Sequence, residues 1–242
     1  MPGIEQVALA VLATLAAAYV RGLAGFGMAI LLVPVLALAI EPAESVFIAN
    51  ILGLLIGLTE VRRLLRESES SARLIALAAL LATPFGFVVL ASTPPDIARF
   101  VIALVALGAF AAIFLPRRPA DMPGPLHTGA TGVAAGLLTG FAGMPGPPVV
   151  PYYLGRDIPK PVARASMMLV FVAASLAGVT SGTLLGVGSW HIAGFGIALF
   201  PVVLLGNWLG NRSFGKVGDR AWRIFTGVVL GAAAAAALIR LV

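Results

Sequence analysis

Arg21 and the glycines that follow it are the residues of this sequence best suited to hold a ligand. They lie in the stretch YVRGLAGFGMAILLVPV, residues 19–35, inside an apolar run. Glycine weakens a helix, and a helix that restarts after a break presents unpaired backbone N–H groups with partial positive charge. A guanidinium beside such a break can hold an oxyanion with two parallel hydrogen bonds. We therefore predict an anion-binding segment composed of Arg21, Gly25, Phe26, Gly27 and Met28. The alternative is that the Arg21 side chain reaches a polar interface or pairs with a carbonyl at a helix end.

A second break of the same kind lies in GMPGPPVV, residues 143–150. Gly143, Met144 and Gly146 could approach a ligand through their backbone atoms. The three prolines of this stretch have no N–H group, so it offers fewer donors than the first break. We expect the ligand to lie between the two breaks, which would contribute to it unequally.

Further polar side chains interrupt apolar runs at Asn50, Thr139, Tyr152, Arg164, Ser166 and Asn207. The uncharged ones could bond a ligand, and Asn50 or Asn207 would be suited to do so, or they could bond only a neighbouring helix. Arg164 either faces the substrate path or anchors the start of a span at the membrane surface.

The composition identifies the solvent of this chain as lipid. The 242 residues are 60% hydrophobic and 11% charged, with a mean hydropathy of +1.04, whereas about 25% of a soluble domain is charged. We predict one polytopic helical membrane domain, residues 1–242. The sequence has no cysteine and only two distant histidines, so we expect no metal and no cofactor. The net charge of +6 follows membrane topology and does not indicate a nucleic-acid partner.

The apolar runs cover 4–20, 23–40, 44–61, 74–91, 97–115, 126–142, 145–154, 162–187, 190–209 and 221–242. Because a spanning helix needs about 20 residues, the runs that meet at each break form either a re-entrant hairpin or two spans. Most of the lysines and arginines fall in or beside four polar breaks, at 62–73, 116–125, 155–161 and 210–220. The positive-inside rule places these four loops in the cytoplasm. Both termini are then predicted outside the inner (plasma) membrane.

The two halves of the chain resemble each other, with GLAG at 22–25 matched by GFAG at 140–143, and Pro34 and Pro42 matched by Pro151 and Pro159. The loop assignment gives the halves opposite orientations. We predict an all-α membrane protein of about eight hydrophobic helices in two inverted repeats, 1–117 and 124–242. Each repeat would begin with a glycine-broken or re-entrant hairpin and continue with three spans. Such repeats are typical of transporters that bind substrate near the membrane midplane.

These motifs resemble the TauE/SafE family of sulfite and organosulfonate exporters. The resemblance rests on the glycine-rich break, the VP-containing run, their repetition with IPKPVARAS, and PVVLLGNWLG before a basic loop. It covers almost the whole chain and implies about eight hydrophobic segments in two repeats. It also implies transport of small sulfur-containing anions, such as sulfite or sulfoacetate. The chain departs from the family in its second half, where GMPGPP replaces a glycine-rich stretch.

Our leading hypothesis is an alternating-access carrier that exports a small anion held between the two breaks. An anion channel of the same architecture is the alternative. A membrane-embedded enzyme is a third hypothesis, although His127 and His191 lie near loop ends and no histidine at depth is within a helical turn of a serine or aspartate, as an activated nucleophile would need. The expected partners are the anion and the bilayer, and a homodimer is left open.

Overall fold

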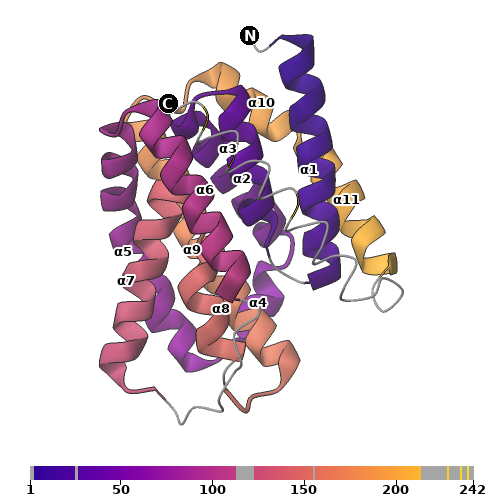
Figure 1. Ribbon diagram of the computed structural model, residues 1–242. Helices are drawn as coiled ribbons and strands as arrows, with labels where there is room; N and C mark the ends of the chain where they lie inside the picture. The colour runs from indigo at the N-terminus through magenta and orange to yellow at the C-terminus, as the bar shows by residue number, and fades with distance from the viewer. Residues whose placement is uncertain are drawn as a thin grey trace.

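The chain folds into a bundle of helices (Figure 1). The computed structural model describes residues 3–24, 27–112, 123–154 and 156–213, together with 228, 235 and 239, and within them it contains helices and no strand. The predicted all-α class is therefore confirmed for this part of the chain. The helices are α1 (Ile4–Ala24), α2 (Met28–Ala39), α3 (Pro42–Leu58), α4 (Val61–Glu67), α5 (Ser70–Ala91), α6 (Pro95–Ala112), α7 (Pro125–Ala142), α8 (Gly146–Leu154), α9 (Lys160–Leu184), α10 (Trp190–Ala198) and α11 (Phe200–Ser213).

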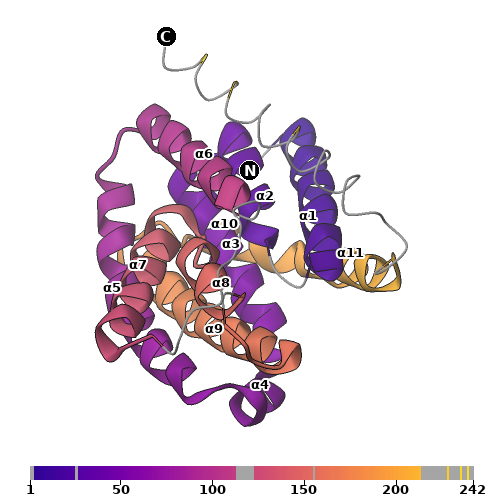
Figure 2. The same ribbon diagram turned by 60° about the horizontal axis from the view of Figure 1, so that its bottom comes forward.

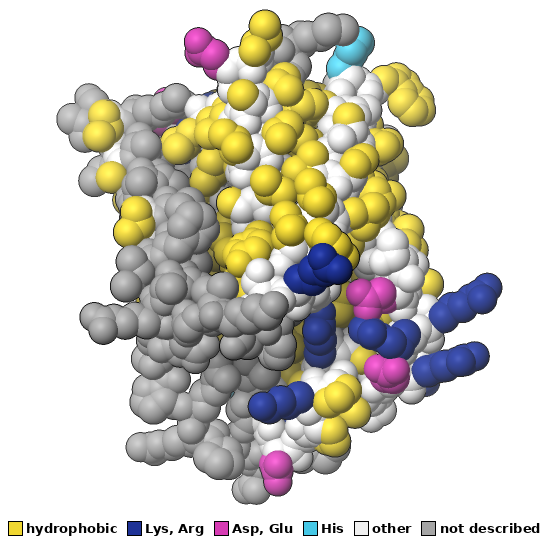
Figure 3. Space-filling model, turned by 90° about the vertical axis from the view of Figure 1, so that its right-hand side faces the viewer, with side chains coloured by type: hydrophobic (Ala, Val, Ile, Leu, Met, Phe, Trp, Pro, Cys, Tyr) yellow, Lys and Arg dark blue, Asp and Glu magenta, His cyan; other side chains and the backbone are white. Residues whose placement is uncertain are grey.

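Several helices are long and apolar enough to cross a bilayer. By length and composition they are α1, α5, α9 and the continuous pair α10–α11, with the bent pair α3–α4 as a further candidate. Large hydrophobic side chains on the outer faces of α5, α7 and α11 are exposed, including Phe85 and Leu205. Figure 3 shows one side of the molecule on which hydrophobic side chains dominate above a band of lysines and arginines. The chain is thus a multi-pass membrane protein.

The structure contains both helix interruptions. α1 ends at Ala24 and α2 begins at Met28, while α7 ends at Ala142 and α8 begins at Gly146. Gly27 and Gly143 have φ angles of 95° and 68°, in the left-handed region that a side chain disfavours. The predicted C-terminal run at 221–242 lies almost entirely outside the described residues.

The two arms of the first hairpin differ in length. α1 has 21 residues, which at 1.5 Å per residue is about 31 Å, enough to cross a hydrocarbon core of about 30 Å. α2 has 12 residues, or about 18 Å, and cannot cross it. α8, with 9 residues, is shorter still. Each hairpin therefore includes a half-length helix.

The observed helices differ from the predicted runs at two points. The stretch predicted as a polar break at 62–73 contains α4, whose axis is bent by 73° from that of α3. The single run predicted at 190–209 is divided at Leu199 into α10 and α11. Neither difference affects the flanking helices, which lie in the apolar runs predicted for them.

Glycines allow two pairs of helices to pack at backbone distance. At the crossing of α5 and α7, a Cβ on Gly132 would lie 2.7 Å from the Ile75 carbonyl oxygen. At the crossing of α1 and α11, a Cβ on Gly22 would lie 2.5 Å from the Asn207 carbonyl oxygen. Side chains larger than hydrogen would force these helices apart.

Buried side chains form two main clusters. The first joins α1, α2, α3 and α6 with residues of α10 and α11, and the second joins α5, α7, α8 and α9. Figure 2 shows the bundle from the end at which α4 lies, and there α8 packs between α7 and α9. Residues of both interruptions line one cavity.

Candidate functional site

A cavity of about 70 Å³ lies between the two helix interruptions. It is lined by Gly27 and Met28 from the first interruption and by Gly143, Met144, Pro145 and Gly146 from the second. Roughly 10–15 Å³ of such space holds one water, so the cavity has room for a few waters or a small anion. The structure brings residues of both predicted segments to one cavity.

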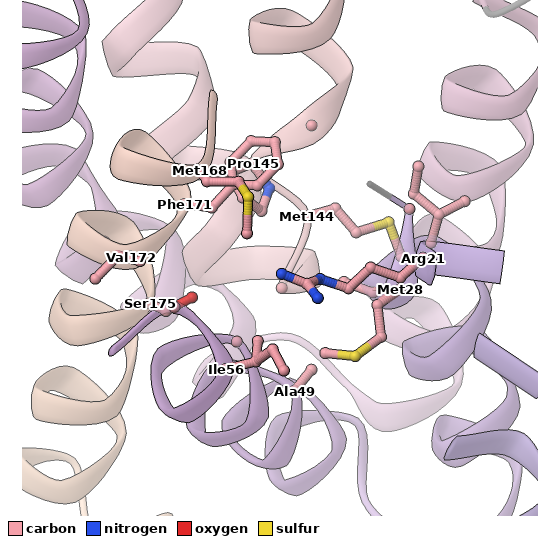
Figure 4. Close-up of a pocket in the computed structure, with 17 residues that line it drawn as sticks. Arg21, Met28, Ala49, Ile56, Met144, Pro145, Met168, Phe171, Val172 and Ser175 are labelled. Atoms are coloured by element: carbon pink, nitrogen blue, oxygen red, sulfur yellow. The ribbon is translucent and has the colours of Figure 1, made fainter. Parts of the chain in front are cut away.

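Arg21 is the charged side chain of the cavity. It is 7% exposed, and its Nη1 donates a hydrogen bond of 2.9 Å to Oδ1 of Asn207 on α11. Figure 4 shows the guanidinium extending into the cavity between Met28 and Met144, toward α9. A guanidinium has five N–H donors, and the bond to Asn207 uses one of them. Asn207 thus fixes the orientation of the guanidinium, whose other donors make no further side-chain hydrogen bond to the described residues.

The N-terminus of α2 opens into the same cavity. Its N-cap residue, Gly27, makes no side-chain capping bond, and Gly27, Met28, Ala29 and Ile30 all line the cavity. The first amides of a helix have no partner within that helix and carry partial positive charge. Arg21 and the start of α2 therefore create a positive potential at one wall.

At the second interruption, two backbone amides are already used within the protein. The Gly143 amide donates to the Thr139 carbonyl at 2.8 Å, and the Met144 amide donates to the Leu138 carbonyl at 3.2 Å. Met144, which we expected to present a free amide, therefore has its N–H occupied. Gly146 at the start of α8 lines the cavity, and the next two residues are prolines. The two interruptions are unequal as anion ligands.

The opposite wall comes from α9 and α3, and the sequence analysis did not identify it. Met168, Phe171, Val172 and Ser175 of α9 line the cavity, at the spacing i, i+3, i+4, i+7 of one helix face. The α3 wall is also one helix face, formed by Ala49, Gly53, Ile56 and Gly57 at the spacing i, i+4, i+7, i+8. In the sequence, these α9 residues continue the helix face on which Arg164 lies. That face could not be recognised there, because a run that is apolar throughout shows no contrast between the side toward protein and the side toward lipid.

The other predicted side chains lie outside the cavity lining. Asn50 is 1% exposed, and its Nδ2 donates to the Val46 carbonyl while its Oδ1 has no partner. Thr139 is buried and bonds the Ala135 carbonyl at 2.6 Å. Arg164 lines a separate cleft. The predicted segment residues Gly25 and Phe26 lie outside the described residues.

Tyr152 and Ser166 belong to a polar network at the end of the bundle near α4 and α8. The Tyr152 hydroxyl is 2.9 Å from Oγ1 of Thr128, and Oγ of Ser166 accepts a bond from the Glu69 amide at 2.9 Å. Both residues bond protein groups here.

The comparison with protein families decides the identity of this bundle. The model of the sulfite exporter TauE/SafE family matches residues 10–237. The chain belongs to the TauE/SafE family. The resemblance read from the sequence motifs is confirmed. Neither the curated proteins nor the solved structures compared with the chain give a match.

As a TauE/SafE protein, the chain is a membrane transporter and not an enzyme, and its family exports sulfite and related sulfur anions. The cavity contains groups of the kind that bind small anions. A buried guanidinium and a helix N-terminus favour such a ligand, and methionine and aliphatic side chains form much of the remaining wall.

Proposed function

We propose that this TauE/SafE protein exports a small, singly charged sulfur oxyanion, a short organosulfonate or hydrogen sulfite, and binds it at Arg21. The observation that carries the proposal is a nearly fully buried arginine that extends into a cavity lined by both helix interruptions. An intramembrane charge that faces a cavity is a functional candidate by default. Arg21 is the charged group among the described lining residues, so one negative charge balances the site.

The lining suits an anion that has an apolar end. Arg21 and the amides of Met28 and Ala29 would hold the sulfonate or sulfite oxygens. The remaining wall includes Met168, Phe171 and Val172, which would pack against a short carbon chain. A strongly hydrated dianion would leave oxygens unpaired against this wall, and an unpaired buried polar group is costly.

We further propose that the two halves, 1–117 and 124–242, are inverted repeats that rock against each other. The close packing supports this. Gly22 of α1 packs on the backbone at Asn207 of α11, and Gly140 of α7 packs on the backbone at Thr83 of α5. Gly22 and Gly140 occupy corresponding positions in the two matched motifs. Alternating access in such folds is largely a rocking of one repeat about a fixed midplane site.

The membrane potential would drive this export. With the inside negative, one negative charge that moves outward gains about 2.3 kcal/mol per 100 mV. The orientation with both termini outside the inner membrane, which we keep as part of the proposal, places the basic ends of α4 and α9 in the cytoplasm. No coupling ion is required on this account. Assembly as a homodimer stays a prediction.

Anion binding by variants of Arg21 tests the proposal. Purified protein is titrated with methanesulfonate, sulfite, sulfoacetate and sulfate, and both the melting temperature and the heat of binding are recorded, because a ligand of the folded state raises its stability. We expect methanesulfonate or sulfite to bind and sulfate to bind weakly. Arg21→Gln should weaken binding about 100-fold, since two charge-assisted bonds of about 1.5 kcal/mol each are lost. Arg21→Lys should restore part of the affinity.

Arg99 provides a matched control. It is a second arginine of a membrane helix, with a side chain 12% exposed and bonded to Asp96 and to the Ala37 carbonyl, and it does not line the cavity. Arg99→Gln should leave anion affinity unchanged. Equal affinities of Arg21→Gln and the parent protein would refute the site. Counterflow in proteoliposomes distinguishes a carrier from a channel, because a channel does not exchange anions against a gradient.

A further inference from the structure

A second, larger hollow lies next to the cavity and is lined by basic side chains. Its volume is about 670 Å³. We call it the basic cleft; its polar lining residues are Thr59, Glu60, Arg62, Arg63, Arg164 and Asn211. These residues come from the bend between α3 and α4, the start of α9 and the end of α11. The cleft therefore lies at one end of the bundle, on the side of α4.

The charges of the basic cleft are not balanced within it. Three arginines and one glutamate line it, which gives a net charge of +2. Arg63 forms an ion pair with Glu60. Among the described residues, neither Arg62 nor Arg164 is in an ion pair. Within the described part of the chain, Arg62 and Arg164 thus face the cleft without an anionic partner.

Arg164 also has an unsatisfied donor. Its Nε is buried and has no hydrogen-bond partner among the residues that the structure describes. Buried donors without a partner are rare and costly, and a guanidinium donor is well matched to an oxyanion. An anion oxygen in the cleft would satisfy the Arg164 group.

The cleft and the cavity are neighbours along two helices. On α3, Gly57 lines the cavity and Leu58 lines the cleft. On α9, Met168 lines the cavity, and Arg164, one turn earlier on the same face, lines the cleft. An anion held at Arg164 would therefore be about one helical turn, roughly 6 Å, from the cavity wall.

We propose that the basic cleft is a second anion site, at which the transported oxyanion binds to Arg62 and Arg164 before it enters the cavity at Arg21. This rests on the proposed function and adds a site to it. The cleft is at the arginine-rich end that the charge distribution places in the cytoplasm, which is the side from which an exporter must load. Its open cationic surface would raise the local anion concentration and the rate of capture.

Transport kinetics test the capture role. Arg62→Gln and Arg164→Gln are compared with Arg66→Gln, which removes an exposed arginine of α4 that does not line the cleft. Efflux of methanesulfonate is measured in proteoliposomes of phosphatidylcholine alone. We expect each cleft variant to raise KM on the loading side about tenfold, the loss of one charge-assisted bond, with kcat nearly unchanged. The ionic-strength dependence of kcat/KM should also become weaker. Arg66→Gln should match the parent protein.

Binding stoichiometry separates this proposal from the proposed function. The parent protein in detergent should bind two methanesulfonate ions, of which Arg21→Gln abolishes one and Arg164→Gln the other. If Arg164→Gln leaves both stoichiometry and KM unchanged, the cleft site is wrong while the cavity site stands. If the Arg164→Gln variant behaves as expected and Arg21→Gln has no effect, the cavity assignment is wrong. Should Arg164→Gln fail to fold, Arg62→Gln and Arg164→Lys carry the same comparison.

An anionic lipid headgroup presents the same oxyanion chemistry as the substrate. Phosphatidylglycerol added to the phosphatidylcholine vesicles distinguishes the two sources. If the cleft holds the substrate, the lipid leaves the KM difference between parent and Arg164→Gln in place. The opposite result has two parts: phosphatidylglycerol binding requires Arg62 and Arg164, and only one methanesulfonate ion binds, whether or not those side chains are present. In that case the cleft is a lipid site and the proposal is overturned.

Discussion

Removing one partner of the buried ion pair between Glu69 and Arg156 should cost several kilocalories per mole of stability. Glu69 is the N-cap residue of α5, and Arg156 lies just beyond α8. Their side chains are 14% and 6% exposed, and Nη1 of Arg156 is 2.6 Å from Oε1 of Glu69. The same carboxylate accepts a 2.6 Å bond from Ser71, and the Arg156 guanidinium lies 5.5 Å from the centre of the Tyr152 ring.

Removing one partner would leave the other charge buried and unpaired. Such a loss costs about 3–5 kcal/mol, and we take about 3 kcal/mol because Glu69 keeps some contact with solvent. Glu69→Gln and Arg156→Gln should therefore each lower the free energy of unfolding by about 3 kcal/mol. For a chain of this size that corresponds to a fall in melting temperature of about 6–12 °C. The double variant should cost no more than either single one, because the second substitution removes the charge that the first leaves unpaired.

A double-mutant cycle measures the coupling. Unfolding is followed by circular dichroism in detergent with increasing denaturant, and the two single costs minus the double cost should give at least about 3 kcal/mol. Glu67→Gln is the control, since its contact with Arg63 is long, at 3.8 Å, and both side chains are about half exposed; it should cost less than about 1 kcal/mol. A coupling below about 0.5 kcal/mol, or equal losses for Glu67→Gln and Glu69→Gln, would refute the reasoning.

Three other substitutions give sharp expectations. Asn207→Asp would place a carboxylate on the Arg21 guanidinium and compete with the anion, so calorimetry should record at least a tenfold loss of methanesulfonate affinity with no loss of melting temperature. Gly140→Ala would place a Cβ 2.5 Å from a backbone nitrogen of α5 and should lower the free energy of unfolding by about 3 kcal/mol, whereas Gly129→Ala, with open space around it, should be neutral or stabilising in the same denaturation assay. Glu60→Gln should keep potential-driven transport in proteoliposomes; its loss would indicate proton coupling instead.

The helix interruptions were predictable because their cause is local. Gly27 and Gly143 adopt left-handed backbone angles that glycine alone adopts readily, and the prolines after Gly143 remove donors whatever the packing. Arg21 was conspicuous for a similar reason, since a charge inside an apolar run requires a partner or a function. The meeting of the 62–73 and 155–161 segments through Glu69 and Arg156 also agrees with their assignment to one side of the membrane.

The walls of the cavity were not predictable because they depend on which helix faces meet. In a soluble helix the polar side identifies the buried side, but lipid and protein interior are both apolar, so α9 gives no such contrast. Asn207 illustrates the same difficulty. Its amide could have bound the ligand, a helix or the arginine, and only the close crossing of α1 and α11 places it on Arg21. The bend at Thr59 and Glu60 likewise depends on packing of α4 against α9.

The centre of the proposed repeats is electrically asymmetric, and this determines which step the membrane potential drives. Arg21 precedes Gly22 in α1, and Thr139 precedes Gly140 at the corresponding position of α7; Thr139 only bonds its own helix. The empty site therefore carries one positive charge, because an arginine stays protonated, and a bound monoanion makes it neutral. The conformational change of the anion-loaded protein would then be insensitive to voltage. The return of the empty protein to its inward-facing state would carry the positive charge inward. Net efflux of the anion should therefore accelerate when the internal potential is negative. The rate of one-for-one anion exchange should not depend on the potential. Exchange that depends on voltage would show that a second charge moves with the anion.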